Sequence, residues 1–570
     1  MPDWNQKRLS KLEQITSDRW ADQLWMVSLT VIALVLLFLG LGNVALRDWD
    51  EGIVAQVARE IWRSQTGQSS DVLTWLYPSI HGTPYLNKPT LVHWLIAQCF
   101  AIGGVNEWTA RFPGAMLTAF SVPVLYGIGR EIFVRRTPAI FAGLVYVTLL
   151  PIMRHGRLAM LDGALVCFFL VMLWCLLRSR RDMRWALGVG IGFGLMCLTK
   201  GAAGLLLGAI ALIFIAWDTP RLLTSGYLWL GMMLGSAPVL AWYWAQWLRY
   251  KDLFWGANVV GQSFGRIWNS VEGNTGPVWF YLIEIAKYTL PWLVFFPQGV
   301  KLAWGNRNLG WAKLLLIWSG GYLLVISLMQ TKLPWYVMPM YPVLALIAGA
   351  ILAEIWEPGD VIGFRYLPRA RFPVAWSVIF GGVAIAGWII SVYLTMIKPD
   401  LMPGLGVILA AISLSLTLVT ILILRRDSQF ILVLLWGMYM SLVMLMASPY
   451  WLWELQESFP VKPVAALIQQ GIPSGQLVAM SYPTSRPSLN FYSDRIVISA
   501  TEFYAQRNMS LSQTNAIARY WKEMPQPYVL VDQATFQKLS LPAVRKLGAT
   551  DEWLLITRDV LAGTHSQKTN

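Results

Sequence analysis

The sequence LRDWDEGIVAQVAREIW, at residues 46–62, begins where an apolar run from about Leu24 to Ala45 ends. That run is long enough to cross a bilayer as a helix. A second polar motif, GTPYLNKPTLVHW at residues 82–94, follows in the same loop. Carboxylates and cations therefore gather directly beyond the end of a membrane span. We expect this loop to carry the chemistry and the rest of the chain to hold it at a membrane surface.

Three carboxylates, Asp48, Asp50 and Glu51, open this loop. Asp50 has the residue type and position of an N-cap for a short helix that runs through Ile61. A capping role for Asp50 and a snorkelling role for Lys88 would each explain one residue. So dense a cluster so close to lipid favours a catalytic role for the group as a whole.

The composition is that of an integral membrane protein. Of 570 residues 56% are hydrophobic and only 13% are charged, and the mean hydropathy is +0.51. The formal charge of +14 comes from Lys and Arg in short clusters between apolar runs, the pattern of cytoplasmic loops, so nucleic acid is not an expected partner. The four cysteines lie in apolar segments and the four histidines are scattered. These residues indicate no metal site, although they leave a divalent metal open.

Charge bias sets the predicted orientation. Lys7, Arg8, Lys11 and Arg19 precede the first span and place the amino terminus in the cytoplasm. The apolar segment Leu91–Gly103 would reach only about 20 Å of a core of about 30 Å, so we expect it to lie in the interface. About thirteen spans result, and the two termini then lie on opposite faces. The spans are predicted near residues 24–45, 112–129, 138–153, 163–177, 185–199, 202–217, 225–247, 279–299, 314–329, 336–353, 374–396, 402–424 and 429–448, with Arg365–Arg371 among the cytoplasmic clusters.

Two domains follow from this pattern. Residues 1–448 form a transmembrane domain of a multi-pass protein of the cell's inner or plasma membrane, with outer-face loops at 46–111 and 249–278. Residues 449–570 form a soluble extracytoplasmic domain in which helical and strand-like runs alternate, which predicts a small α/β module. Its helices are expected at Pro463–Gln470 and near Ser512–Trp521. Its strands are expected at Gln476–Ser481, Arg495–Ser499, Tyr528–Val531 and Trp553–Ile556.

The motifs resemble those of the polyprenyl-phosphate-sugar-dependent glycosyltransferases of the C-type fold, which include the aminoarabinose transferases of lipid A and the protein O-mannosyltransferases. The matching pieces lie in order between about residues 25 and 350. They are Asp50-Glu51 before Ala58-Arg59-Glu60, Tyr85-Leu86-Asn87-Lys88-Pro89 with Trp94, Met160-Leu161-Asp162, Leu198-Thr199-Lys200-Gly201, Gly265-Arg266 before Pro277-Val278-Trp279-Phe280-Tyr281, and Thr331-Lys332-Leu333-Pro334-Trp335-Tyr336. The resemblance implies an inverting transferase that places a sugar from a polyprenyl-phosphate carrier on a glycolipid like lipid A, a glycan or a protein.

The resemblance also implies roles for the acidic residues. Asp50 corresponds to the catalytic base, with Glu51 as the adjacent alternative, and Asp162 to a second acidic position. Taken alone, Asp162 has the position of an N-cap for the span that begins at Gly163. A base, or a carboxylate that orients the acceptor hydroxyl, is what such a transfer requires.

Four cations from separate loops or span ends would share the outer membrane surface. They are Lys88, Lys200, Arg266 and Lys332, with Arg59, Tyr85 and Tyr336 in support. A lysine at a span end is usually a snorkelling anchor, but four cations on the face that bears the carboxylates favour a site for the donor phosphate. Lys200 is the least specific of the four, because it ends one span and begins the next.

The sequence departs from the family at two places. Asn87 precedes Lys88 where the aminoarabinose branch carries an acid, and no His precedes Pro277. The alternative to an enzyme is a lipid or sugar transporter without transfer chemistry. A transporter predicts ionisable residues at mid-membrane depth and repeats between halves. Here the ionisable residues gather at one face.

Overall fold

The computed structural model describes residues 3–67, 72–80, 82–270, 273–357, 373–452 and 460–559, without the side chains of residues 3–18 and 72. The side chains of Lys7, Arg8 and Lys11 and the whole of Arg365–Arg371 lie outside this part. The contacts divide the chain into two compact units. The first comprises Met1–Asn43, Leu86–Leu95 and Arg111–Leu452, and the second comprises Val44–Tyr85, Ile96–Ala110 and Trp453–Asn570.

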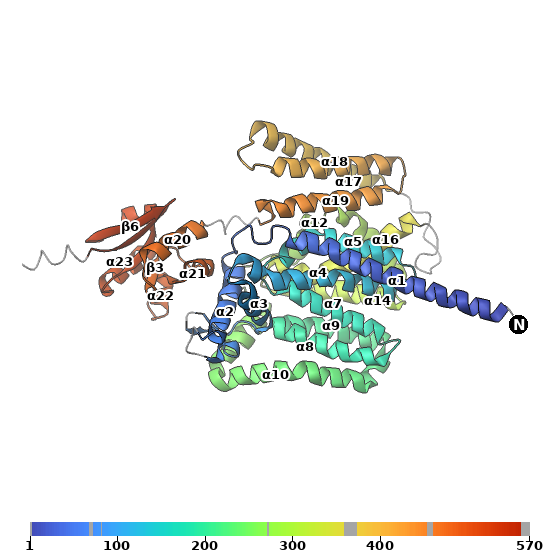
Figure 1. Cartoon of the computed structure of the whole chain (residues 1–570), viewed down its shortest axis with the longest axis horizontal. Helices are drawn as coiled ribbons and strands as arrows, with labels where there is room; N and C mark the ends of the chain where they lie inside the picture. Colours follow the sequence, from blue (N-terminus) through green and yellow to red (C-terminus); the bar gives the residue numbers. More distant parts are fainter. Residues whose placement is uncertain are drawn as a thin grey trace, which may run out of the picture. The chain divides into compact units, whose positions relative to one another are not determined.

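The first unit is helical (Figure 1). Helices lie at every one of the predicted span positions. Their bounds are α1 Asp3–Phe38, α4 Glu107–Ile132, α5 Thr137–Thr148, α6 Leu150–Gly156, α7 Asp162–Arg178, α8 Ala186–Lys200, α9 Ala202–Asp218, α10 Gly226–Phe254, η4 Trp255–Phe264, α11 Gly265–Trp268, α12 Phe280–Tyr288, α13 Phe296–Gly305, α14 Gly310–Leu316, α15 Tyr322–Leu328, η7 Pro334–Met340, α16 Tyr341–Trp356, α17 Val374–Val392, α18 Leu405–Leu424 and α19 Phe430–Ala447.

Seven helical segments among the described residues are long and apolar enough to cross a membrane, or eight if α5 and α6, bent by 59°, form one span. The protein is therefore an integral membrane protein. Several helices at the predicted span positions are too short or too broken to be counted by length and apolar composition. The number of thirteen spans therefore stays a prediction. Leu91–Gly103 is a helix, α3, with the bounds expected from the sequence.

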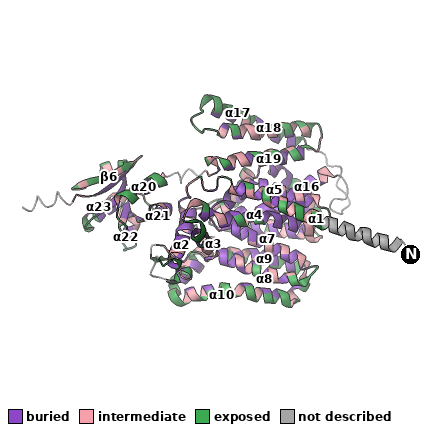
Figure 2. Ribbon diagram, in the orientation of Figure 1, coloured by how far each residue is buried: buried purple, intermediate pink, exposed green. Residues whose placement is uncertain are grey.

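Burial separates the inner helices of this unit from the outer ones (Figure 2). The segment Pro334–Trp356 includes α16, and 94% of its most apolar stretch is buried inside the protein. In Val374–Ile397, which includes α17, the buried share is 22%. Outer helices such as α10 and α17 instead expose large apolar side chains, among them Leu240 and Ile385. Lipid tails are as apolar as these side chains, so such a surface is stable in a bilayer.

Helices α8 and α10 pack backbone against backbone through two glycine pairs. A Cβ added at Gly190 would lie 2.1 Å from the carbonyl carbon of Gly231, and one at Gly194 would lie 2.0 Å from the oxygen of Gly235. Both pairs follow the small-xxx-small spacing that lets membrane helices approach closely. Figure 1 shows the two helices side by side.

Arg157 closes the end of the first span. Its side chain is fully buried, and its two Nη atoms donate to the oxygens of Leu36 and Leu39, at 3.0 and 2.6 Å. Its guanidinium also lies 4.3 Å from the ring centroid of Trp451. A cation at these carbonyls satisfies acceptors that a helix leaves open at its C-terminus.

The tail folds as the predicted α/β module. Its sheet has the order β4-β3-β5-β7-β6. Strands β4, β3 and β5 are parallel to one another, and β7 is antiparallel to both of its neighbours, β5 and β6. Sequence reasoning missed β6, which has mixed burial, and the short helices α21, α22 and α24. The bounds are α20 Val461–Gly471, β3 Leu477–Met480, α21 Pro487–Ser493, β4 Ile496–Ser499, α22 Ala500–Ala505, α23 Gln513–Glu523, β5 Tyr528–Asp532, α24 Gln533–Lys538, β6 Val544–Thr550 and β7 Trp553–Arg558.

Alternating side chains of the sheet enter two cores. On β5, Leu530 packs with residues of α20 and α21, whereas Val529 and Val531 pack with residues of α22 and α23. Period-two alternation of this kind buries both faces of a strand. The same unit contains β1 Ser79–Ile80, β2 Thr83–Pro84 and α2 Trp49–Gln65. The tail therefore packs with α2, a helix of the loop that was predicted to carry the chemistry.

Candidate active site

The acidic motif forms the first turn of α2, but Asp50 does not cap it. The N-cap position is occupied by Asp48, and Asp50 lies inside the helix. The prediction that Asp50 caps this helix was therefore wrong, because the helix begins two residues earlier than expected. Glu51 instead supports the helix start, because its Oε2 accepts from the backbone nitrogen of Arg47 at 2.9 Å. A glutamate at the third helical position that reaches back in this way resembles a capping box.

Asp50 and Glu51 differ in access. The carboxylate of Asp50 lies 3.2 Å from Arg47 and its side chain is 22% exposed, whereas Glu51 is fully buried. An acceptor hydroxyl can reach only an accessible carboxylate. This difference favours Asp50 over Glu51 as the base.

Asp48 and Arg59 of the same segment pair with the tail. Asp48 contacts Arg486 at 2.7 Å and Ser488 Oγ at 2.6 Å, and its burial raises the pKa of the carboxyl group. Arg59 pairs with Asp494 at 2.5 Å, and burial lowers the pKa of its guanidinium to about 10. Tyr85 is buried, which raises the pKa of its phenol.

Within the first unit, Lys88 lies in a cluster of like charges. Burial, followed by the positive charges of Arg266 and Lys200, lowers the pKa of the Lys88 ammonium to about 7, and the negative charge of Asp162 opposes this. Residues from three distant segments therefore meet near one ammonium. Cations converge at such a cost when an anion binds among them.

Asp162 is the first residue of α7, and the N-cap is Leu161, so Asp162 does not cap this helix. It pairs with Lys200, with 2.7 Å between Oδ1 and Nζ, and both side chains are largely buried. Lys200 Nζ also lies 5.5 Å from the ring centroid of Tyr336. The second acidic position of the resemblance thus lies beside a predicted phosphate ligand.

Arg266 is oriented by two polar groups. Its Nη1 donates to the Tyr336 hydroxyl at 2.7 Å, and its Nη2 donates to Gln262 Oε1 at 2.8 Å. Asn258 donates to the oxygens of Leu86 and Asn87 and so holds the backbone before Lys88. Sequence reasoning missed Gln262 and Asn258, although both lie in the loop 249–278. Their polar side chains in that loop were the available signal.

Lys332 has a different environment. Its Nζ donates to the oxygens of Ser327 and Ile326, at 2.6 and 3.2 Å, so the ammonium caps the end of α15. Burial lowers the pKa of this ammonium as well. The local geometry favours a structural role for Lys332, and its role as a phosphate ligand stays a prediction.

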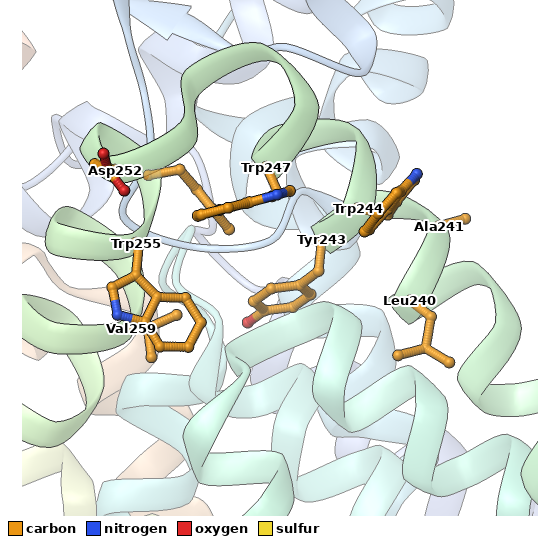
Figure 3. Close-up of a pocket in the computed structure, with 9 residues that line it drawn as sticks. Leu240, Ala241, Tyr243, Trp244, Trp247, Asp252, Trp255 and Val259 are labelled. Carbon is orange, nitrogen blue, oxygen red and sulfur yellow. The ribbon is translucent and has the colours of Figure 1, made fainter.

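A cavity of about 810 Å³ opens in the first unit between α10 and η4. Figure 3 shows Trp247, Tyr243 and Trp255 around it, and almost all of the lining is apolar. A Cβ added at Gly201 would lie 2.7 Å from the Tyr243 hydroxyl, so one wall reaches the residue after Lys200. An apolar, aromatic cavity of this size suits a hydrocarbon ligand.

Known glycosyltransferases resemble this chain over part or most of its length. The family model described as dolichyl-phosphate-mannose-protein mannosyltransferase matches residues 87–244. The undecaprenyl phosphate-alpha-4-amino-4-deoxy-L-arabinose arabinosyl transferase 2 of Pseudomonas fluorescens is 28% identical over 416 residues, which cover 67% of this chain and 72% of the relative. A Pseudomonas aeruginosa transferase of that kind is 30% identical over 299 residues, or 51% of this chain and 54% of the relative.

The fold is shared with a solved transferase. The structure of ArnT from Cupriavidus metallidurans bound to undecaprenyl phosphate superimposes with a TM-score of 0.74 and 19% identity, over 94% of this chain and 98% of that one. The chain is a polyprenyl-phosphate-sugar glycosyltransferase of the C-type fold. It is therefore an enzyme, and the transporter alternative is set aside.

A transferase of this family needs groups for the phosphate and for the acceptor. The predicted residues for the first are Lys88, Lys200, Arg266 and Lys332, and the predicted residue for the second is Asp50; these assignments stay predictions. Among the described parts of the chain, no group of three or more His, Cys, Asp or Glu residues has a metal-binding arrangement.

Proposed function

We propose that this transferase moves a sugar from a polyprenyl-phosphate carrier to a hydroxyl or similar group of an acceptor at the non-cytoplasmic face. The observation that carries the proposal is the presence of Lys200 and Arg266 near the buried Lys88, whose pKa is lowered to about 7 first by burial and then by these two positive charges. A phosphate among them would offset the repulsion and accept charge-assisted hydrogen bonds. These bonds strengthen as negative charge grows on the leaving phosphate.

The proposed reaction is a single displacement. The acceptor oxygen forms a bond to the anomeric carbon as the bond between that carbon and the phosphate oxygen breaks, and the carrier leaves as polyprenyl phosphate. The acceptor proton passes to Asp50. One carboxylate is sufficient for such a step, and it inverts the anomeric centre. Asp162 orients Lys200 through their ion pair.

The apolar cavity at Tyr243, Trp247 and Trp255 is proposed to take part of the isoprenoid chain. Its wall adjoins Gly201, next to a proposed phosphate ligand. Trp247→Ala should then weaken binding of a long-chain polyprenyl phosphate and leave a two-isoprene analogue unaffected. Equal affinities of Trp247→Ala and the unmodified protein for the long chain would contradict this assignment.

The test of the function is a membrane assay with radiolabelled polyprenyl-phosphate sugars, followed by separation of lipid, glycan and protein products. Undecaprenyl phosphate-4-amino-4-deoxy-L-arabinose, the donor named for the relatives, is the first compound to assay. Because Asn87 stands where the aminoarabinose branch carries an acid, donors with other sugars should be assayed beside it. The proposal would be contradicted if, for every donor, the radiolabel stayed on the carrier and none appeared in the lipid, glycan or protein products.

A further inference from the structure

Helix α21 of the tail packs directly on the first turn of α2. A Cβ added at Gly52 would lie 2.6 Å from the backbone nitrogen of Ser488 and 3.0 Å from its Cα. Real Cβ atoms do not approach backbone this closely, so the contact requires glycine at position 52. Gly52 is two residues from Asp50, and the fit therefore sets where that turn lies against the tail.

A buried ion pair holds the start of α2. Asp48 Oδ2 lies 2.7 Å from Arg486 Nη1, and each side chain is 3% exposed. Ser488 donates to Asp48 Oδ1 from its backbone nitrogen at 3.2 Å and from its hydroxyl at 2.6 Å. A buried pair with further hydrogen bonds specifies one geometry, because loss of either partner leaves the other charge uncompensated.

A second ion pair holds the same helix further along. Arg59 donates to Asp494 Oδ1 at 2.5 Å and to the oxygen of Phe491 at 2.6 Å. Arg63 also contacts Asp494, at 2.6 Å. The Arg59 side chain is only 7% exposed. Asp494 therefore anchors the C-terminal half of α2, as Arg486 anchors its start.

Residues that precede Asp50 are held by the tail as well. The Trp49 indole nitrogen donates to the oxygen of Ser485 at 3.0 Å, and the Leu46 nitrogen donates to the Tyr492 hydroxyl at 2.8 Å. The tail thus contacts α2 and the residues before it through ion pairs, hydrogen bonds and close packing. Such a set exceeds what is needed to tether a loop.

We propose that the tail domain is a positioning element of the enzyme, in which Arg486 and Asp494 fix α2 so that Asp50 meets the acceptor in one orientation. Arg486 and Asp494 are positioning residues, since they act through Asp48 and Arg59. The inference rests on the proposed role of Asp50. It gives the tail, whose own residues form no recognisable catalytic motif, a function in turnover.

The experiment compares full-length purified Arg486→Met, Asp494→Asn and Gly52→Ala with the unmodified enzyme. For each, kcat and KM of transfer, the dissociation constant for polyprenyl phosphate and amide hydrogen exchange of α2 are measured. We expect kcat to fall about 10- to 100-fold, the scale of a misplacement near 1 Å. Phosphate affinity should change less than about twofold, because its ligands lie in the other unit. Arg486→Lys should recover part of kcat, and α2 should exchange faster in Arg486→Met.

Two control variants accompany these. Arg519→Met removes an exposed ion pair with Glu523 in the same domain, and Gly382→Ala adds a methyl group where nothing lies within 4 Å. Both should keep kcat. Unchanged kcat and unchanged exchange of α2 in Arg486→Met and Gly52→Ala would overturn the proposal. Equal losses of kcat and phosphate affinity would also overturn it, since they indicate general misfolding.

Asp50→Asn separates this inference from the proposed function. If Asp50→Asn stays active while Arg486→Met loses kcat, the tail positions α2 but the base is another residue, and the inference as stated is wrong. If Asp50→Asn is inactive while Arg486→Met is fully active, the proposed function stands and the positioning role falls.

Discussion

Asp48 and Arg486 form an ion pair of 2.7 Å with only 3% of either side chain exposed, although 438 residues separate them in the chain. The pair joins the segment beyond the first span to the tail within one compact unit. Its Asp48 is one of three neighbouring carboxylates, of which Asp50 and Glu51 were the predicted candidates for the base. Burial gives each a different role: Asp48 pairs with the tail, Glu51 supports the helix start, and Asp50 remains accessible.

Asp50→Asn should lower kcat by about two or more orders of magnitude, the scale for loss of a general base. Folding should be retained, because the Asp50 side chain is partly exposed and isosteric with Asn. Glu51→Gln should behave differently and lower the melting temperature, since the buried carboxylate bonds the Arg47 nitrogen. Turnover assays with thermal melts distinguish the two. Normal turnover in Asp50→Asn would transfer the role to another residue.

Lys88→Ala and Arg266→Ala should each weaken carrier binding by roughly 1.5 to 3 kcal/mol, the range for charge-assisted hydrogen bonds. The double variant should lose less than the sum, because both residues bind one ligand. Lys332→Ala should mainly lower thermal stability, given its bonds to the end of α15. Isothermal titration with short-chain polyprenyl phosphate measures the affinities, with the exposed Lys398→Ala as control. Unchanged affinities in both single variants would remove the proposed site.

Binding of the donor should weaken above about pH 7. Lys88 has a pKa of about 7 without ligand, and a bound anion favours the protonated form and raises that pKa. The stabilisation is therefore complete below pH 7 and is lost as the pH rises, by at most about tenfold per pH unit for one proton. Titration of a sugar phosphodiester between pH 6 and 9 measures this, and Lys88→Arg should flatten the profile. A flat profile in the unmodified enzyme would contradict the assignment.

Gly194→Val should lower the thermal stability of the first unit. The added carbons would meet the backbone of α10, where even a Cβ would lie 2.0 Å from the Gly235 oxygen. Gly382→Val, at an open position of α17, is the matched control. Melting curves in detergent compare the two. Equal melting temperatures would show that α8 and α10 tolerate wider spacing.

The tail should lie outside the cytoplasm. An odd number of spans and a cytoplasmic amino terminus require this orientation. A reporter fused after Thr569 that is active only outside the cytoplasm should give signal, and one active only in the cytoplasm should not. The opposite result would mean that the span count is wrong by one, first of all at Leu91–Gly103.

The membrane class, the positions of the membrane helices, the α/β class of the tail and the candidate cations could all be predicted from the sequence. Apolar length, alternation and charge bias are properties of local segments, so they can be read without knowing the fold. Lys88, Lys200, Arg266 and Lys332 were predicted to share one membrane surface as a phosphate site, with Lys200 as the least specific member. The charges of Arg266 and Lys200 do act on Lys88. The site itself stays a prediction.

Three features could not be predicted from the sequence. They are which carboxylate is accessible, the hydrogen bonds of Lys332 to the carbonyls of α15, and the contact of α21 with α2. Asp48, Asp50 and Glu51 are chemically alike, but Asp48 is buried against Arg486 and Ser488, hundreds of residues later in the chain. The capping error at Asp50 has the same origin, since Asp48 and Asp50 are equally good caps by residue type. Pairing with distant residues and loss of solvent determine which of these similar residues takes which role. Neither effect can be predicted from a local sequence pattern.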